Sequence, residues 1–251
     1  MKDIKKIKII TQKEVDSLEA YKSPKDNQKY IGIELEFYSK VSGFELIQYL
    51  VHAGLAECVN LGSDGSVYPP RGYNSYEMRI LSTEKNLNKT IATICSILNH
   101  VDSGVNKTCG MHVHLDMRGR NKEKAFYNLV NSQSLLYSLN PSSRRSNSYC
   151  RPTPSTDFEA YENQRDGINK HAFSEHRTIE VRIHAGTLDK LKIINWVKLL
   201  IKIVDHDQLS AKHSTLTAFS KEYKLSSTLI RYIKERLIKF KSDPNNLMIA
   251  S

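Results

Sequence analysis

Ile31-Gly-Ile-Glu-Leu-Glu-Phe37 alternates apolar and polar side chains from one position to the next. This period of two is typical of a β-strand whose faces meet different surroundings. Its polar face carries Glu34 and Glu36, and residues two apart on a strand point the same way. Two carboxylates side by side repel each other unless a cation lies between them. The stretch therefore predicts a strand with a cation site, the alternative being a surface strand with two solvated glutamates.

Two later stretches show the same alternation: Gly110-Met-His-Val-His-Leu-Asp116 and Thr178-Ile-Glu-Val-Arg-Ile-His184. Their polar positions hold imidazoles, carboxylates and one guanidinium, namely His112, His114, Asp116, Glu180, Arg182 and His184. With carboxylates and imidazole as ligands, a hard ion such as Mg²⁺ or Mn²⁺ fits best. Each stretch alone also fits a plain role, either a pair of hydrogen-bonded histidines or a surface ion pair worth roughly 0–1 kcal/mol. Three such strands together favour phosphoryl transfer, in which carboxylates hold metal ions and arginine neutralises the developing charge.

Two further carboxylates are candidate metal ligands. Asp64 lies in the glycine-rich turn 62–66, where capping the turn is the alternative role. Glu77 begins another alternating stretch beside Arg79, where an ion pair is the alternative.

The long polar stretch 140–156 supplies candidate clamps for phosphate or carboxylate groups, because arginine binds such groups through two hydrogen bonds. These clamps are Arg144, Arg145 and Arg151. The alternative for them is a solubilising role. A loop of this length inside a compact domain is usually functional or disordered, and its arginines favour the functional interpretation.

Strands and helices are expected to alternate along the chain. The patterns predict strands at 30–37, 55–59, 76–81, 111–116 and 178–184, and helices at 44–53, 86–101, 122–139, 188–204, 210–223 and 226–241. Strands of a parallel sheet covered on both faces are continuously apolar, whereas these alternate. The sequence thus predicts an α+β fold with a mainly antiparallel sheet, helices on one face and polar residues on the other.

Composition limits the classes of protein. The 251 residues include 39% hydrophobic and 25% charged side chains, and no run approaches the roughly 20 apolar residues of a membrane helix. We therefore expect a soluble protein with one core. The basic start of the chain lacks the apolar segment of a secretion signal, and the four cysteines form no CxxC pair. A cytoplasmic location without a membrane partner is the expectation.

The formal net charge of +10 suggests anionic partners. One class is nucleic acid, and the other is small molecules such as nucleotides and carboxylates. Much of the excess lies near the ends of the chain, in Lys5, Lys6, Lys8, Arg231, Lys234, Arg236, Lys239 and Lys241. A surplus of this kind is more often a solvated face, so nucleic acid is not favoured.

Four pieces of the chain, in this order, resemble the amidoligase family of carboxylate–amine ligases, which are related to glutamine synthetase and glutamate–cysteine ligase. They are Gly32-Ile-Glu-Leu-Glu-Phe37, the Asp64-Gly-Ser66 turn with Glu77 downstream, Gly110-Met-His-Val-His114 and Thr178-Ile-Glu-Val-Arg182. The resemblance extends from Tyr30 to Val204. It implies a glutamine synthetase-like catalytic fold, in which a curved, mainly antiparallel sheet carries the active site on its concave face.

Carried over by position, the resemblance implies ATP and two metal ions, Mg²⁺ or Mn²⁺. The residues that would hold the ion next to the γ-phosphate are Glu34, His112 and Glu180. Those that would hold the ion on the carboxylate and amine side are Glu36, Glu77 and Asp64.

The resemblance also implies contacts to the anionic groups. Arg182 would contact the phosphoryl group, and His114 would contact the phosphates or the substrate. Arg144 or Arg145 would match the arginines that stabilise the acyl phosphate.

The expected organisation is a mobile basic N-terminal segment at 1–28, an amidoligase-like catalytic domain at 29–206 and a C-terminal helical extension at 207–251. The expected enzyme uses ATP and Mg²⁺ to convert a carboxylate to an acyl phosphate, which an amine attacks to give a peptide-like amide bond. Its substrates would be small carboxylates and amines, including peptides and cell-wall precursors. The alternatives are a metal-dependent hydrolase or oxygenase built on the strand of His112 and His114, and a basic nucleic-acid-binding protein.

Overall fold

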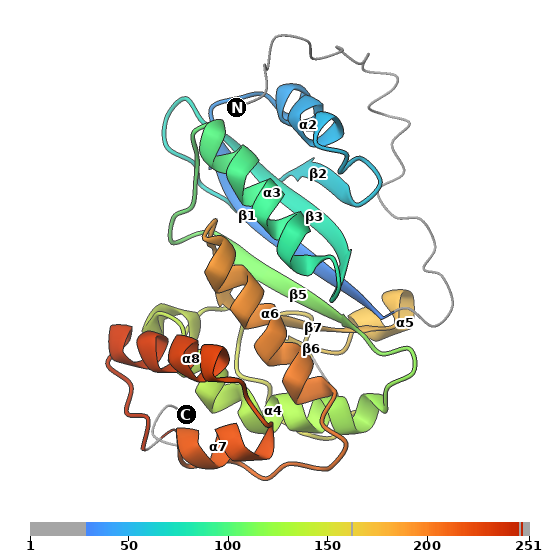
Figure 1. Ribbon diagram of the computed structural model, residues 1–251, viewed down its shortest axis with the longest axis vertical. Helices are drawn as coiled ribbons and strands as arrows, with labels where there is room; N and C mark the ends of the chain where they lie inside the picture. Colours follow the sequence, from blue (N-terminus) through green and yellow to red (C-terminus); the bar gives the residue numbers. More distant parts are fainter. Residues whose placement is uncertain (1–28, 162, 246, 248–251) are drawn as a thin grey trace. The chain divides into compact units, whose positions relative to one another are not determined.

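The computed structural model describes residues 29–161, 163–245 and 247 (Figure 1). The predicted mobile segment at 1–28 lies outside these residues. The described chain forms two compact units. Unit 1 contains the residues up to Cys109 together with Gly186–Lys190, and unit 2 contains Gly110–Ala185 and the chain from Leu191 onward. Within each unit the strands pair antiparallel, and the described residues include seven α-helices, so the predicted α+β class is confirmed.

The strands of unit 1 are β1 (Tyr30–Ser39), β2 (Val59–Ser63), β3 (Asn74–Thr83) and β4 (Ser103–Gly104). β1 pairs along its whole length with β3, β2 pairs with the other edge of β3, and β4 pairs with the end of β1. The register places Glu36 opposite Glu77, and Gly62 of β2 on the other side of Glu77. This ladder determines which acidic side chains of unit 1 become neighbours.

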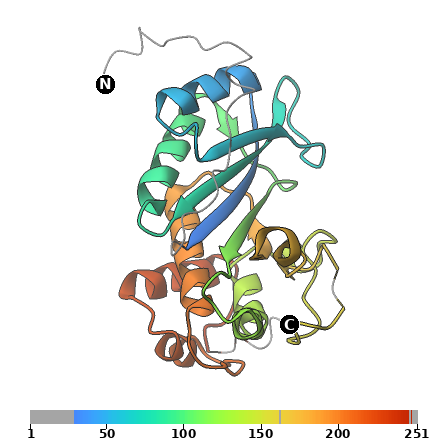
Figure 2. The same cartoon turned by 90° about the vertical axis from the view of Figure 1, so that its right-hand side faces the viewer.

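Two helices cover unit 1, α2 (Gly43–His52) and α3 (Leu87–His100). Figures 1 and 2 show both helices on the same side of β1 and β3. The apolar positions of β1 are buried, namely Ile31, Ile33, Leu35 and Phe37. Burial of such side chains against helices is the main force that holds this layer together.

The strands of unit 2 are β5 (Gly110–Asp116), β6 (Ile168–Asn169) and β7 (Thr178–Ala185), with β7 paired to both others. Its α-helices are α4 (Lys122–Ser138), α5 (Ala172–His176), α6 (Lys190–Val204), α7 (Leu216–Glu222) and α8 (Ser227–Lys239). Helix α6 starts at Lys190, which ends the segment counted with unit 1. Trp196 of α6 is fully buried, as expected for a core residue.

Two predicted elements are wrong in position. The predicted strand at 55–59 is a turn up to Cys58, because Gly54 ends α2 with a positive φ of 73° and Cys58 N donates to the Leu55 carbonyl. The predicted helix at 210–223 begins only at Leu216, where the Thr215 hydroxyl accepts from Ala218 N. The main chain before α7 is bonded to α4 and not within a helix, because Ser210 N donates to the side chain of Asn128 on α4.

The predicted boundary between 206 and 207 does not coincide with the division into units. Helices α7 and α8 belong to unit 2 with α4 and α6. Arg236 shows the connection, because its Nε donates to the Leu139 carbonyl at the end of α4, 2.8 Å away. The basic residues predicted for the last helix therefore do not all face solvent.

Candidate functional site

Unit 1 contains a group of three carboxylates, Glu36, Asp64 and Glu77, here called the acidic cluster. One ligand oxygen of each lies within 4.8 Å of the others. Glu36 and Glu77 come from paired strands, and Asp64 follows β2, where its Oδ1 accepts from Ser66 N at 2.7 Å. Asp64 therefore caps its turn and still points a carboxylate oxygen at the other two. Three carboxylates at this spacing are suited to a hard divalent cation.

Arg79 provides positive charge beside the acidic cluster. Its Nη2 lies 2.5 Å from Glu77 Oε1, and its Nε lies 3.8 Å from Glu34 Oε1. The Arg79 side chain is 51% exposed, so solvent weakens both ion pairs. The ion pair considered as the alternative role of Glu77 is thus present together with the carboxylate grouping.

Replacing Arg79 with methionine is expected to tighten Mn²⁺ binding to the acidic cluster by about tenfold. The guanidinium paired with Glu77 repels a metal cation at the acidic cluster, and its removal lifts that repulsion. Solvent reduces the repulsion but does not abolish it. Isothermal titration calorimetry with Mn²⁺ measures the change. The exposed Arg71→Met is the matched control. An Arg79→Met affinity equal to that of the wild type would remove Arg79 from any role in metal binding.

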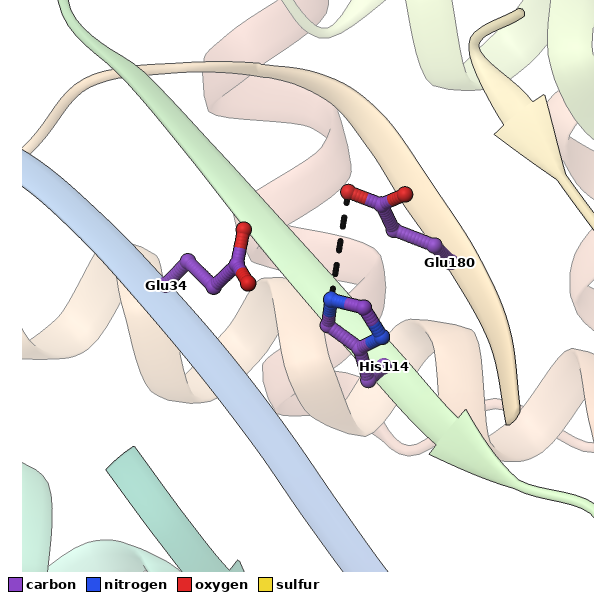
Figure 3. Close-up of side chains that lie close together, drawn as sticks. All are labelled: Glu34, His114 and Glu180. Carbon is purple, nitrogen blue, oxygen red and sulfur yellow. Dashed lines mark ion pairs between the residues drawn. The ribbon is translucent and has the colours of Figure 1, made fainter. Parts of the chain in front are cut away.

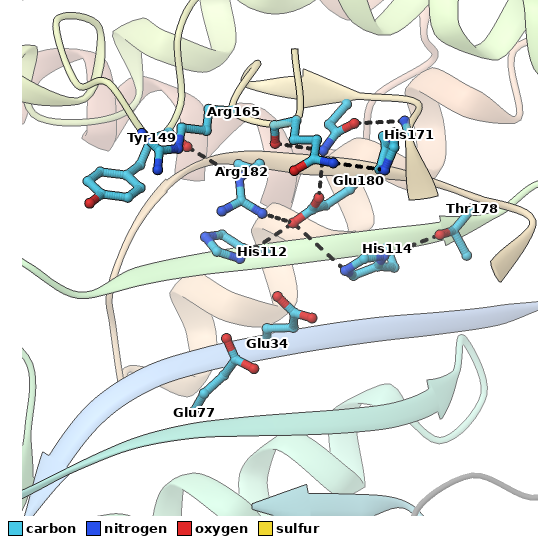
Figure 4. Close-up of polar contacts among 12 residues, drawn as sticks. Glu34, Glu77, His112, His114, Tyr149, Arg165, His171, Thr178, Glu180 and Arg182 are labelled. Atoms are coloured by element: carbon cyan, nitrogen blue, oxygen red, sulfur yellow. Dashed lines mark hydrogen bonds and ion pairs between the residues drawn. The ribbon is translucent and has the colours of Figure 1, made fainter. Parts of the chain in front are cut away.

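Unit 2 contains the second group of predicted site residues, His112, His114, Glu180 and Arg182, here called the His–Glu–Arg cluster. Glu180 is its centre and is 4% exposed. Its Oε1 lies 2.5 Å from Arg182 Nη1, 3.5 Å from His112 Nδ1 and 3.8 Å from His114 Nε2. Figure 3 shows the ion pair of His114 and Glu180, and Figure 4 shows the contacts of Glu180 with His112, His114 and Arg182. Two imidazoles and a carboxylate that converge on one point can bind a metal ion.

Neighbouring groups fix the orientation of these side chains (Figure 4). His114 Nδ1 is 3.2 Å from the Thr178 hydroxyl, which leaves Nε2 on the side of Glu180. Arg182 Nε donates to the Tyr149 carbonyl at 3.2 Å. Contacts of this kind around ligands set their tautomer and direction.

A β-bulge interrupts the pairing of β5 with β7. The register pairs Met111 with His184 but Val113 with Val181, so two residues of β7 oppose His112. Such an extra residue shifts the alternation of the strand. The polar face that continues through Glu180 and Arg182 therefore does not include His184.

His184 instead packs into the core of unit 2, and the prediction that it shares the polar face is wrong. His184 is 1% exposed, and the centroid of its ring lies 4.8 Å from the ring centroid of Trp196. Burial, followed by the positive charge of Arg236, lowers the pKa of His184 from 6.5 to about 3. The imidazole is therefore neutral in the folded protein at neutral pH.

This buried imidazole is expected to make folding acid-sensitive. Between pH 6.5 and about 3 the unfolded state binds a proton at His184 that the folded state does not. The free energy of unfolding therefore falls by roughly 1.4 kcal/mol per pH unit as the pH drops through this range. Urea unfolding at pH 6.5 and 5.5 should show a shallower pH dependence in His184→Gln than in the wild type. The exposed His52→Gln should keep the wild-type dependence, and an equal dependence in His184→Gln would contradict the assignment.

The guanidinium of Arg144 is hydrogen-bonded to main-chain carbonyls inside the fold. It is 6% exposed, its Nε donates to the Ile183 carbonyl at 3.1 Å, and its Nη2 donates to the Arg182 carbonyl at 2.6 Å. These are the carbonyls of the two β7 residues that oppose His112 at the bulge. The guanidinium stabilises the bulge that aligns the His–Glu–Arg cluster.

The other arginines of the loop differ from Arg144. Arg145 Nε is buried and donates no hydrogen bond to any group in the described part of the chain. Burial lowers the pKa of Arg145. Arg151 is exposed, and its backbone bridges to that of Asp166. Between the two arginines that the resemblance offers for the acyl phosphate, Arg145 is the one whose Nε is not bonded to the main chain.

Two residues near the His–Glu–Arg cluster differ from what the sequence predicts. Asp116 was expected beside the histidines, but both its carboxylate oxygens bind Arg118 at 2.8 Å. Asn169, in contrast, contacts Glu180 directly. Asn169 lies on a strand of two residues, which is too short for a periodic signal.

Searches of protein-family models and of curated proteins found no match to this chain. The resemblance to amidoligases therefore rests on its four motifs. Among the helices that the structure describes, none is long and apolar enough to span a bilayer. The four cysteines are free, and three of them, Cys95, Cys109 and Cys150, are buried.

Proposed function

We propose that this chain is an ATP- and Mg²⁺-dependent carboxylate–amine ligase that forms an amide bond through an acyl phosphate. The observation that carries the proposal is the acidic cluster, where ligand oxygens of Glu36, Asp64 and Glu77 lie within 4.8 Å of one another. Carboxylates held this close are costly unless a cation balances their charge. A hard divalent ion is the cation that such oxygen ligands select.

The His–Glu–Arg cluster supports phosphoryl transfer as the reaction class. Arg182 is held by Glu180 and by the Tyr149 carbonyl, and its side chain remains 19% exposed. A guanidinium fixed in this way is preorganised for an anionic group, because little side-chain freedom is lost when the anion binds. His114 stands beside it as a second group for phosphate or substrate.

In this proposal the acidic cluster holds one Mg²⁺, and Glu34, His112 and Glu180 hold the other. When bound, the ions would neutralise the phosphate charge of ATP and polarise the group that is transferred. Arg182 would orient the phosphoryl group, and Arg145 is the better of the two loop arginines for the acyl phosphate. Sharing of one ion by Glu34, His112 and Glu180 is inferred from the resemblance.

Hydroxylamine trapping tests the proposal without knowledge of the amine. The protein is incubated with ATP, Mg²⁺, hydroxylamine and a panel of amino acids, short peptides and cell-wall precursor fragments. An acyl phosphate reacts with hydroxylamine to give a hydroxamate, and ADP and phosphate are released. We expect hydroxamate that depends on both ATP and Mg²⁺ and disappears with a chelator. ATP-independent turnover of any panel member would contradict a ligase.

A second candidate is a metal-dependent hydrolase or oxygenase. The observation in its favour is that imidazole nitrogens of His112 and His114 both lie within 3.8 Å of Glu180 Oε1. Two histidines and one carboxylate form a common ligand set for Fe²⁺ and Zn²⁺. Elemental analysis of the purified protein separates the two, since this candidate requires stoichiometric zinc or iron and no nucleotide.

The nucleic-acid-binding alternative gains no specific support. One of the basic residues that suggested it, Arg236, is buried and bonded to the Leu139 carbonyl. It also leaves the acidic cluster without a role.

A further inference from the structure

Asn169 lies at the back of the His–Glu–Arg cluster. It is one of the two residues of β6, and the register places it directly opposite Glu180 on β7. Its side chain is on the side of Glu180, and the residue is 4% exposed. A buried carboxamide is costly unless its donors and acceptor are bonded, so its partners indicate what it does.

Both the nitrogen and the oxygen of the Asn169 carboxamide are hydrogen-bonded. Nδ2 donates to Glu180 Oε2 at 3.1 Å and to the Gln164 carbonyl at 2.9 Å. Oδ1 accepts from His171 N at 2.7 Å. Two main-chain groups on either side of β6 thus anchor the carboxamide, and its remaining N–H points at the carboxylate. An amide can do this because its nitrogen carries two hydrogens.

The two oxygens of Glu180 consequently have different environments. Oε2 accepts from Asn169, whereas Oε1 lies 2.5 Å from Arg182 Nη1 and faces His112 and His114. The terminal torsion of a glutamate is broad when it is unrestrained. With both oxygens bonded, the carboxylate is fixed about this torsion, and Oε1 is the oxygen presented to the histidines.

We infer that Asn169 is a positioning residue, which holds Glu180 so that Oε1 is the oxygen available to a metal ion. The inference rests on the proposed function, because it takes Glu180 to be a metal ligand. Groups that orient a ligand in this way typically contribute about 10–100-fold to metal affinity. In this inference Asn169 acts through Glu180 and is not itself a ligand of the metal or of the substrate.

Paramagnetic broadening by Mn²⁺ tests this inference at the cluster itself. Mn²⁺ alone is titrated into the full-length protein while the imidazole proton resonances of His112 and His114 are followed, with His→Gln variants for assignment. In Asn169→Ala we expect the Mn²⁺ concentration at half-broadening to rise at least tenfold. The KM for the metal in the ADP-release assay should rise in parallel, while kcat at saturating metal changes less.

A matched control separates positioning from general stability. Asn128 is also fully buried, and its carboxamide donates to the Gln208 carbonyl and accepts from Ser210 N. Asn128→Ala therefore removes a comparable buried amide that is hydrogen-bonded to the main chain of Gln208 and Ser210 and not to Glu180. It should leave the Mn²⁺ concentration at half-broadening unchanged. Asn169→Ser replaces Asn169→Ala if the latter does not fold, because its shorter hydroxyl does not reach the carboxylate.

The outcomes are distinct. If Mn²⁺ fails to broaden the two imidazoles in the wild type, the proposed metal role of Glu180 fails. If the wild type is broadened and the folded Asn169 variants have the same midpoint, the positioning role is wrong while the proposed function stands. An equal shift in Asn128→Ala would also overturn it, since loss of stability alone would then explain the effect.

Discussion

Replacing Glu180 with glutamine is expected to lower ATP-dependent ADP release by on the order of 1000-fold. The substitution preserves the size of the side chain but removes its charge. Glu180 is the residue on which His112, His114, Arg182 and Asn169 converge. Without the carboxylate, Arg182 loses its counter-charge, and the proposed metal ion would lose a ligand. A coupled assay for ADP, at saturating ATP and Mg²⁺, measures the rate.

The control for this substitution is Glu175→Gln. Glu175 belongs to the short helix just before β7, and its side chain is 72% exposed. We expect its rate to equal that of the wild type. Full turnover by a folded Glu180→Gln protein would remove Glu180 from the proposed active site.

Replacing Arg144 with methionine is expected to destabilise the protein by about 2–6 kcal/mol. The guanidinium donates to the carbonyls of Arg182 and Ile183. Each buried carbonyl that loses its donor costs roughly 1–3 kcal/mol, and methionine fills much of the space without replacing either bond. Urea unfolding followed by circular dichroism gives the free energy of unfolding.

Arg151→Met is the matched control, since Arg151 is exposed in the same loop. A surface change of this kind is usually within about 0.5 kcal/mol of the wild type. If Arg144→Met were equally mild, the bulge would not depend on the guanidinium. A loss of activity without loss of stability would instead favour the direct contact with an acyl phosphate.

The strands with a clear period of two were predictable from the sequence. The predicted strands at 30–37, 76–81, 111–116 and 178–184 lie within β1, β3, β5 and β7. Each alternates over at least six residues, which is enough for the pattern to stand out. The strand predicted at 55–59 failed because its apolar residues belong to a turn that Gly54 begins.

Features that depend on distant parts of the chain were not predictable. The period of two continues through His184, yet the bulge turns that residue toward Trp196. Nothing local marks the bulge, because its carbonyls are satisfied by Arg144 from about forty residues earlier. The start of α7 at Leu216 likewise depends on the contact of Ser210 with Asn128.

The candidate site was predictable in its residue types but not in its partners. Glu36, Asp64 and Glu77 were expected to share an ion, and their ligand oxygens do lie together. The register that brings Glu36 opposite Glu77 is a property of the β1–β3 ladder. Whether Arg144 or Arg145 is available to a ligand depends on which guanidinium is bonded inside the fold.

The most direct test of the central claim is binding of a non-hydrolysable ATP analogue, measured by isothermal titration calorimetry. The titration is run with Mg²⁺ and then with excess chelator, for the wild type and for Glu34→Gln. The account predicts binding that requires Mg²⁺ and is lost in Glu34→Gln. Absence of binding to the wild type with Mg²⁺ or Mn²⁺ would contradict a nucleotide-dependent ligase.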